Sequence, residues 1–415
     1  MRRLSILGST GSIGKQTLEV CRNAPDDFTV EGLSCGSDTD TLYEQIKEFD
    51  PKAAAVSDEA KGAELAQRLK DEGIKTELYI GPDSSTVIAE LSSCDTVVGA
   101  IVGFAGLEPV YRAILSGKTI ALANKETLVA GGDFIIPLAK EKGVDILPID
   151  SEHSAIWQCL RNGDHKNLDR ILITASGGPF RGKIRDDLTD VTAEKALNHP
   201  TWKMGGKITI DSATMMNKGL EIIEAHHLFG VSVDRVDVVV HPQSIVHSMV
   251  LLKDGSVLAQ MGRPSMILPI LVALYYPERG PAVSRPFNPF EEGCNNLTFE
   301  KCDTDVFRLV GLAYDVGRRG GLLPCVMNAA NETAVMAFLA GKIGFLDIER
   351  TVFEVCSAFD SSASPMSSSR MVKYPPRTVE TNVSVFLISV LSIEYCILLM
   401  YFLFVLLSSR KMLAP

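Results

Sequence analysis

Short apolar runs alternate with helical patterns over the first 150 residues of the chain. The runs predict strands at LSIL (4–7), FTVEGLSC (28–35), AAAV (53–56), TVVGAIV (96–102), TIALA (119–123) and DILPI (145–149). Segments between them, such as 15–22 and 42–49, have the spacing of amphipathic helices. Strands that alternate with helices in this way predict a parallel, doubly wound sheet.

The pattern changes after residue 150. Longer spacings separate the predicted strands RILITAS (170–176), DRVDVVVH (234–241), SIVHSMVLL (244–252) and SVLAQM (256–261), and a helix is expected at 218–229. This change predicts a second, α+β domain with a partly antiparallel sheet. Two amphipathic stretches that end in glycines, at 307–317 and 329–341, predict a helical region after it.

The end of the chain has a different composition. Residues 357–369 contain seven serines in thirteen positions and are typical of a linker. Residues 383–407 are mainly apolar, carry one charge, Glu394, and are long enough to cross a bilayer of about 30 Å. A membrane anchor and a variant or frame-shifted translation both explain this tail. At the other end we expect no export or organellar leader, because an apolar strand follows Met1 almost directly.

Charge and cysteine content narrow the class of protein. The 415 residues include 41 Lys and Arg against 51 Asp and Glu, and the formal charge of −10 disfavours nucleic acid as a partner. The nine cysteines are scattered and never spaced C-x-x-C, so we expect neither a disulfide framework nor a zinc ribbon. Reduced thiols favour a cytoplasmic location, with a plastid or a membrane-tethered location as alternatives.

A glycine-rich loop, Gly8-Ser-Thr-Gly11-Ser-Ile-Gly14, follows the first predicted strand and opens a helix at once. Backbone amides and the positive end of a helix suit the pyrophosphate of a dinucleotide. The second strand ends in small and polar residues before Asp38. Because neither a clear ribose-binding carboxylate nor a basic loop stands there, the residues alone do not decide between NAD and NADP.

Polar segments follow two more strands, at 124–126 and 150–153. Ligands bind at this edge of doubly wound sheets. In an extended segment, Asp150 and Glu152 point to the same side and could share one hard cation. A solvated strand end that caps a helix is the alternative.

A helix over 216–228 would place an amide, an amine and a carboxylate on one face. Asn217 and Glu221 are spaced i, i+4, and Lys218 and Glu221 are spaced i, i+3. Such a face suits a phosphorylated substrate chelated to a metal, and carboxylates without His or Cys favour Mg²⁺ or Mn²⁺. An ordinary helical salt bridge is the alternative.

Two loops also have residues suited to a substrate. Ser176-Gly-Gly-Pro-Phe leaves a predicted strand in a tight turn that could hold phosphate oxygens. Segment 199–206 combines His199, Trp202 and Met204 with two glycines, which is the composition of a mobile flap. A buried tryptophan in an ordinary core is the alternative.

Taken in order, GSTGSIG, ANKE, DSEH, SGGPF, HPTWKMG, DSATMMNKGLE and HPQSIVHSMV resemble the 1-deoxy-D-xylulose 5-phosphate reductoisomerase family over about residues 1–356. The resemblance implies an NADPH-dependent, Mg²⁺- or Mn²⁺-dependent homodimer that makes 2-C-methyl-D-erythritol 4-phosphate for non-mevalonate isoprenoid biosynthesis. It also implies the domains: a Rossmann-type domain at 1–150, a catalytic metal- and substrate-binding domain at 151–290, and a linker with a truncated C-terminal helical domain at 291–356. The composition of the tail adds a Ser-rich linker at 357–382 and a possible transmembrane helix at 383–407.

The resemblance further assigns roles to single residues. The implied metal ligands are Asp150, Glu152 and Glu221, with Lys125 as a further catalytic residue. The implied substrate-binding residues are Ser151, Ser176, His199, Trp202, Ser212, Asn217 and Lys218. The implied cofactor-binding residues are Thr10, Gly11, Ser12, Ile13, Gly36, Asn124, Glu126, Met204 and Gly205.

The chain departs from the family pattern in two places. Ser265 and Ile267 stand where the family has Asp and Arg, which puts local packing or charge pairing in question, and the family's helical end is replaced after residue 356. A catalytically impaired, membrane-tethered member of the family is therefore one alternative. A related oxidoreductase acting on another phosphorylated carbonyl compound is the other.

Overall fold

The computed structural model describes residues 1–161, 163–202 and 204–363, and the chain divides into two compact units. Unit 1 contains Met1–Gly177, Thr201–Gly205 and Glu224–Cys302. Unit 2 contains Gly178–Pro200, Gly206–Ile223 and the described chain from Asp303 onward. These units follow contacts rather than chain order, and the domain boundaries predicted at residues 150, 290 and 356 stay a prediction.

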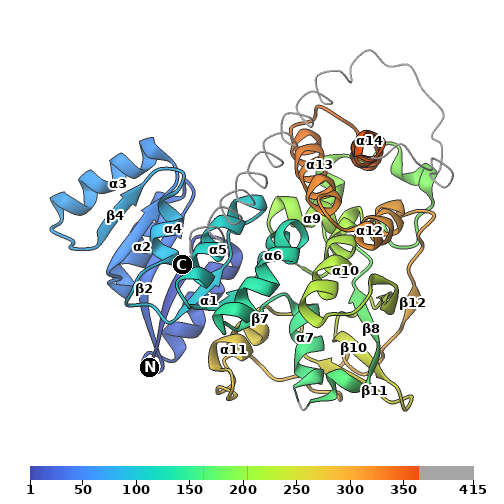
Figure 1. Ribbon diagram of the computed structural model, residues 1–415, viewed down its shortest axis with the longest axis horizontal. Coiled ribbons are helices and arrows are strands. Elements are labelled where there is room, and N and C mark those ends of the chain that lie inside the picture. The colour runs from blue at the N-terminus through green and yellow to red at the C-terminus, as the bar shows by residue number, and fades with distance from the viewer. Residues whose placement is uncertain (162, 203, 364–415) are drawn as a thin grey trace, which may run out of the picture. The chain divides into compact units, whose positions relative to one another are not determined.

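A seven-stranded sheet, parallel throughout, forms the first part of unit 1 (Figure 1). Its strands are β1 (Arg2–Leu7), β2 (Phe28–Cys35), β3 (Ala53–Val56), β4 (Glu77–Ile80), β5 (Thr96–Gly99), β6 (Thr119–Leu122) and β7 (Ile146–Pro148). Their order is β4-β3-β2-β1-β5-β6-β7, so the direction of winding reverses between β1 and β5. The predicted doubly wound sheet is confirmed, with the short edge strand β4 added.

The helices of unit 1 mostly connect these strands. They are α1 (Ser12–Asn23), α2 (Thr39–Phe49), α3 (Glu59–Asp71), α4 (Ser84–Ala89), α5 (Leu107–Leu115), α6 (Glu126–Lys142), α7 (Ser151–Leu160) and α11 (Ile267–Tyr275). Apolar residues of β1, α1 and α11, among them Ile6, Leu18 and Ile270, share one buried core. Arg2 fastens the end of α11 to this sheet, because its guanidinium donates to the carbonyl oxygens of Leu274 and Tyr276, each at 2.6 Å.

Ser265 and Ile267, which differ from the family pattern, lie at the start of α11. Ile267 is its first residue and is buried in the same core. The Ser265 hydroxyl accepts a hydrogen bond from the backbone N–H of Ile267 at 3.2 Å. Ser265 and Ile267 therefore supply a hydrogen-bond acceptor and a core side chain at the start of this helix.

A five-stranded mixed sheet completes unit 1. Its strands are β8 (Leu168–Ala175), β9 (Val236–Val240), β10 (Val246–Leu252), β11 (Val257–Met261) and β12 (Glu300–Lys301), in the order β11-β10-β8-β9-β12. Strands β8 and β9 are parallel and the other pairs are antiparallel, which confirms the partly antiparallel prediction. Helix α7 follows β7 of the first sheet and packs against β10 and β11 of the second.

Unit 2 is helical in the described residues. It contains α8 (Ala193–Leu197), α9 (Gly206–Ala213), α12 (Arg308–Arg319), α13 (Leu323–Leu339), α14 (Phe345–Ala363) and the first part of α10 (Met216–Phe229), whose last six residues belong to unit 1. Helix α13 packs against α9, α12 and α14. The aromatic rings of Phe180, Phe338 and Phe345 join these elements at centroid distances of 5.2 and 5.7 Å.

Helix α14 extends beyond the predicted helical region. It continues to Ala363 and so covers the first seven residues of the segment 357–369 that the sequence predicts as a linker. Its buried positions Val352, Val355 and Cys356 hold it to the unit. Across the described chain, no helix is long and apolar enough to cross a membrane. The predicted span at 383–407 lies outside the described residues.

Candidate active site

The glycine-rich loop lies at the carboxyl end of β1, where the sheet order reverses. Gly8 has φ +79°, and a Cβ there would meet the Ala100 carbonyl oxygen at 2.7 Å. Gly14 is buried so tightly that a Cβ would lie 2.4 Å from the Gly8 oxygen and from Ser9 Cα. The loop therefore requires glycine at both places.

The first turn of α1 has no side-chain cap, and its N-cap residue is Gly11. The helix start at Gly11 and Ser12 is exposed. Thr10 and Ile13 are half-buried on either side. Amides at such a helix start have no partner within the helix and attract an anion, so this geometry fits a pyrophosphate.

The carboxylate nearest the end of β2 is already used inside the protein. Asp38 is the N-cap of α2, and its side chain accepts a hydrogen bond from the backbone N–H of Thr41 at 3.2 Å. Gly36 precedes it, and nothing lies within 4 Å of the place a Cβ would take. The sequence left the ribose contact open, and the structure shows Asp38 as an exposed residue that caps α2.

Asn124 is held by the loops around it. Its Nδ2 donates to the carbonyl oxygens of Ile101 and Gly103 at 2.7 and 2.9 Å, and its Oδ1 accepts from the Thr127 N–H at 2.8 Å. Only 3% of Asn124 is exposed. Its side chain ties the loop after β5 to the start of α6, where Glu126 is also buried. A direct cofactor contact of either residue stays a prediction.

Lys125 and Asp150 form a buried ion pair at the ends of β6 and β7. Lys125 Nζ lies 2.8 Å from Asp150 Oδ2, and the two side chains are 7% and 11% exposed. Removing two charges from water costs free energy, so a buried ion pair contributes little net stability. Such a pair at the ligand-binding edge of the sheet is therefore a functional candidate.

The predicted geometry of Asp150 and Glu152 is wrong in one respect. The segment is not extended: Asp150 is the N-cap residue of α7, and Ser151 and Glu152 begin its first turn. An Asp-Ser pair at a strand end favours a helix start over further extension. The Ser151 hydroxyl donates to a Glu152 carboxylate oxygen, so these neighbours still present oxygen atoms at one strand end.

Sequence reasoning missed His153, a buried residue of unit 1 that contacts both Asp150 and Glu224. His153 Nδ1 lies 3.6 Å from Asp150 Oδ2 and 3.2 Å from Glu224 Oε2. His153 and Glu224 are 0% and 1% exposed. His153 lies in α7, three residues after Asp150, whereas Glu224 lies in α10, far along the chain. The sequence therefore does not indicate that they meet until the two helices are placed.

The predicted flap is divided between the units, with His199 in unit 2 and Trp202, Met204 and Gly205 in unit 1. Trp202 lies beside His247, at a ring-centroid distance of 6.5 Å. His199 is partly buried and His247 is buried, and desolvation lowers the pKa of each imidazole below its usual value. The rings are therefore favoured in their neutral forms near pH 7.

The residues predicted to bind the substrate phosphate lie in loops and near the ends of helices. Ser176 directly follows β8, and the next two residues, Gly177 and Gly178, both have positive φ, at +87° and +65°. Within unit 2, a Cβ on Gly178 would meet the Ser212 carbonyl oxygen at 2.6 Å. Ser212 and Asn217 remain partly exposed.

Helix α10 confirms the predicted spacing around Glu221. Lys218 Nζ and Asn217 Nδ2 each donate to one of its carboxylate oxygens, the first at 2.5 Å. Glu221 is 0% and Lys218 is 5% exposed. The helical salt bridge given as the alternative is therefore present and buried, and the metal-binding role of Glu221 stays a prediction.

Family models of 1-deoxy-D-xylulose 5-phosphate reductoisomerase match most of the chain. One matches residues 4–132, the model of its C-terminal domain matches residues 146–229, and the DXP reductoisomerase C-terminal domain matches residues 261–377. Proteins named 1-deoxy-D-xylulose 5-phosphate reductoisomerase from Clostridium perfringens (strain 13 / Type A) and Desulfitobacterium hafniense (strain DSM 10664 / DCB-2) are 50% and 52% identical over 360 residues. Each alignment covers 87% of this chain and 93% of the relative.

Solved structures agree. A DOX-P reductoisomerase crystallised with NADPH, fosmidomycin and magnesium is similar at a TM-score of 0.85 and 39% identity, over 95% of this chain and 98% of that one. The Zymomonas mobilis enzyme with NADPH is similar at a TM-score of 0.80 and 39% identity, over 96% and 99%. The chain therefore belongs to the 1-deoxy-D-xylulose 5-phosphate reductoisomerase family.

Proposed function

We propose that this chain catalyses the NADPH-dependent rearrangement and reduction of 1-deoxy-D-xylulose 5-phosphate to 2-C-methyl-D-erythritol 4-phosphate. The observation that carries the proposal is the buried pairing of predicted site carboxylates with lysines: Asp150 with Lys125, and Glu221 with Lys218. Fold stability alone does not require such pairs. Relatives about 50% identical bear the name of this enzyme.

The glycine-rich loop supports the cofactor assignment. Its glycines bring the backbone close to the start of α1, whose amides would hold the phosphates at Thr10, Gly11, Ser12 and Ile13. A solved relative is described in complex with NADPH. Gly36, Met204 and Gly205 are the further residues for which we propose cofactor contacts.

Asp150, Glu152 and Glu221 are the proposed ligands of the divalent cation. An all-oxygen carboxylate set fits Mg²⁺ or Mn²⁺ by its chemistry, and a solved relative is described in complex with magnesium. When bound, the cation polarises the ketone and hydroxyl oxygens of the substrate, and NADPH supplies the hydride. In this scheme Lys125 and Lys218 orient the carboxylates through the ion pairs that they form.

The remaining predicted residues would hold and enclose the substrate. Lys218 is a buried cation on the same helix face as Asn217, and this pair suits a phosphate group. Ser176 and Ser212 offer hydroxyls beside turns that require glycine. His199 and Trp202 lie on the flap segment, where closure would exclude water, and Ser151 would orient the substrate from the start of α7.

A homodimer is also proposed, with β11 as one contact. This edge strand of the second sheet leaves Val257 50%, Leu258 37% and Met261 39% exposed. Edge strands usually carry charges that prevent pairing, and β11 contains none. Light scattering is expected to give the mass of two chains; a monomer at micromolar concentration would contradict this part of the proposal.

A cofactor-oxidation assay tests the function. We expect NADPH to be consumed only when 1-deoxy-D-xylulose 5-phosphate and Mn²⁺ are both present. Consumption with other phosphorylated ketones but not with this one would favour a related oxidoreductase. NADPH binding without turnover would favour the catalytically impaired member of the family.

A further inference from the structure

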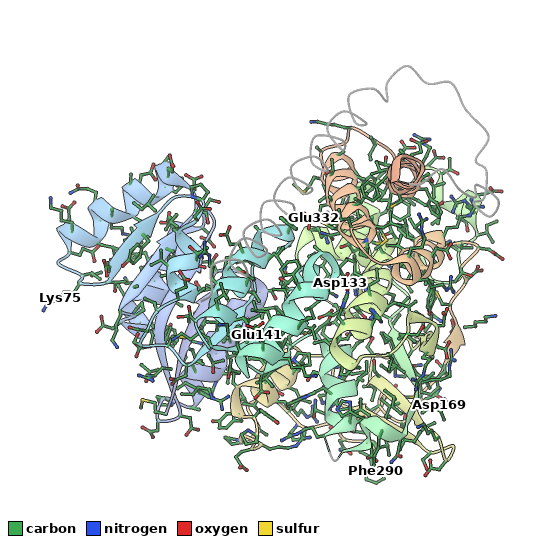
Figure 2. All side chains as sticks on the ribbon, viewed as in Figure 1. Lys75, Asp133, Glu141, Asp169, Phe290 and Glu332 are labelled. Carbon is green, nitrogen blue, oxygen red and sulfur yellow. The ribbon has the colours of Figure 1, made fainter. Side chains whose placement is uncertain are left out.

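A buried polar cluster in unit 2 lies beside Ser212 and is used by none of the roles assigned above. Asp211, which is 1% exposed, accepts a hydrogen bond from Asn331 Nδ2 at its Oδ1, at 2.7 Å. Its Oδ2 lies 2.7 Å from Lys207 Nζ. The carboxylate thereby joins the first turn of α9 to its last turn and to α13, the helix on which Glu332 is labelled in Figure 2.

We propose that Asp211, held by Lys207 and Asn331, is a positioning residue that fixes Ser212 for the phosphate of the substrate. The inference rests on the proposed function, because it takes Ser212 as a phosphate-binding residue. Asp211 directly precedes Ser212 in the chain. A carboxylate anchored at both oxygens leaves the backbone of its neighbour little freedom to rotate.

Two further features show that the backbone at Ser212 is held in one conformation. Gly178 approaches so closely that a Cβ there would lie 2.6 Å from the Ser212 carbonyl oxygen. Met215, which is buried and follows three residues later, has φ +60°, an uncommon value for a residue other than glycine. A strained residue persists only where its surroundings determine the conformation. The turn from Ser212 to Asn217 is therefore imposed by the packing around it.

The cluster is poorly explained as a stabilising element. Replacing a buried ion pair by apolar residues of similar volume often leaves stability unchanged or raises it. Asn331 is 0% exposed, and its carbonyl oxygen lacks a hydrogen-bond donor among the described residues. A buried acceptor without a donor is unfavourable. A role in positioning Ser212 explains the cluster, whereas a role in stabilising the core does not.

The test compares two variants with wild type in the NADPH-oxidation assay. Asn331→Leu removes the donor to Asp211 at nearly constant volume, and Asp211→Asn removes the charge at constant shape. We expect each to raise KM for 1-deoxy-D-xylulose 5-phosphate about tenfold, which corresponds to about 1.4 kcal/mol, and to weaken competitive inhibition by inorganic phosphate to a similar extent. The expected kcat lies within about threefold of wild type, and KM for NADPH is unchanged.

A matched control separates positioning from general destabilisation. Glu349→Gln breaks a partly buried ion pair of unit 2, with Arg185 at 2.6 Å, which joins the segment before α8 to α14. It is expected to lower the melting temperature without changing KM or phosphate inhibition. Variants at Asp211 and Asn331 that fold and bind phosphate as wild type does would overturn the inference. An inactive wild-type chain would overturn the proposed function, and the assignment of Ser212 with it.

Discussion

Replacing Gly14 by alanine is expected to weaken NADPH binding by roughly one to two orders of magnitude while the fold persists. The added Cβ would lie 2.4 Å from the Gly8 oxygen and from Ser9 Cα. These are backbone atoms, so the clash cannot be relieved by rotating a side chain, and the loop has to move. Overpacking of this kind costs about 1–3 kcal/mol, against about 5–15 kcal/mol of stability in an ordinary domain.

The binding loss follows from the displaced amides. A hydrogen bond to a charged group is worth about 1.5–3 kcal/mol, so losing one phosphate contact raises Kd by roughly 10- to 150-fold. The gain of about 1 kcal/mol in helix propensity from alanine does not restore that contact.

Fluorescence titration with NADPH measures the effect, and two other glycines serve as controls. Gly11→Ala adds a Cβ with a single neighbour, the Gly8 oxygen at 3.3 Å, and should weaken binding less. Gly311→Ala in α12 meets nothing within 4 Å and should leave Kd unchanged while stabilising the protein by about 0.5–1 kcal/mol. A folded Gly14→Ala variant with Kd within twofold of wild type would refute this account of the loop.

Three other predictions follow from the described residues and the sequence. Glu221→Gln should reduce turnover at saturating Mn²⁺ to less than a tenth, a loss of at least about 1.4 kcal/mol, with NADPH affinity unchanged in titration; more residual activity would contradict its assignment as a metal ligand. Burial lowers the pKa of His227 from 6.5 to about 4, so the unfolded chain binds more protons between these values and stability falls as pH drops from 6.5 toward 4. Between pH 7 and pH 5, the free energy of unfolding measured in urea should fall less for His227→Asn than for wild type. Equal decreases would show that His227 is not the cause of the pH dependence. Deleting residues 364–415 removes the apolar segment and keeps all of α14, so the yield of soluble protein should rise, whereas a fall would show that the segment packs against the protein.

The sequence predicts the first sheet well because its signals are local. Each buried parallel strand is a short apolar run, and the loop at Gly8 is defined by residues next to one another in the chain. The helix around Glu221 is predicted for the same reason, since spacings of three and four residues bring side chains onto one face. The prediction of an extended segment at the start of α7 is wrong because the same Asp-Ser pair suits both an extended strand end and a helix cap.

The rest depends on contacts between distant segments. The partners of His153 include Glu224, and those of Asp211 include Asn331, 120 residues away. Asn331 lies in a helix of mainly apolar composition, and an amide there is a weak sign of a buried hydrogen bond. Neither its partner nor the division of the chain into two units can be derived from periodicity, because both are set by tertiary packing.

The structure of the reaction product tests the central claim most directly. In the rearrangement the bond between C3 and C4 of 1-deoxy-D-xylulose 5-phosphate breaks and C4 joins C2, so the carbon that bears the methyl group still carries no hydrogen. Simple reduction of the ketone instead places a hydrogen on that carbon. The protein is incubated with substrate, Mn²⁺ and NADPH, and the product is examined by proton NMR. The account predicts a methyl singlet, with one NADPH consumed for each product molecule. A methyl doublet from the unbranched alcohol would contradict it.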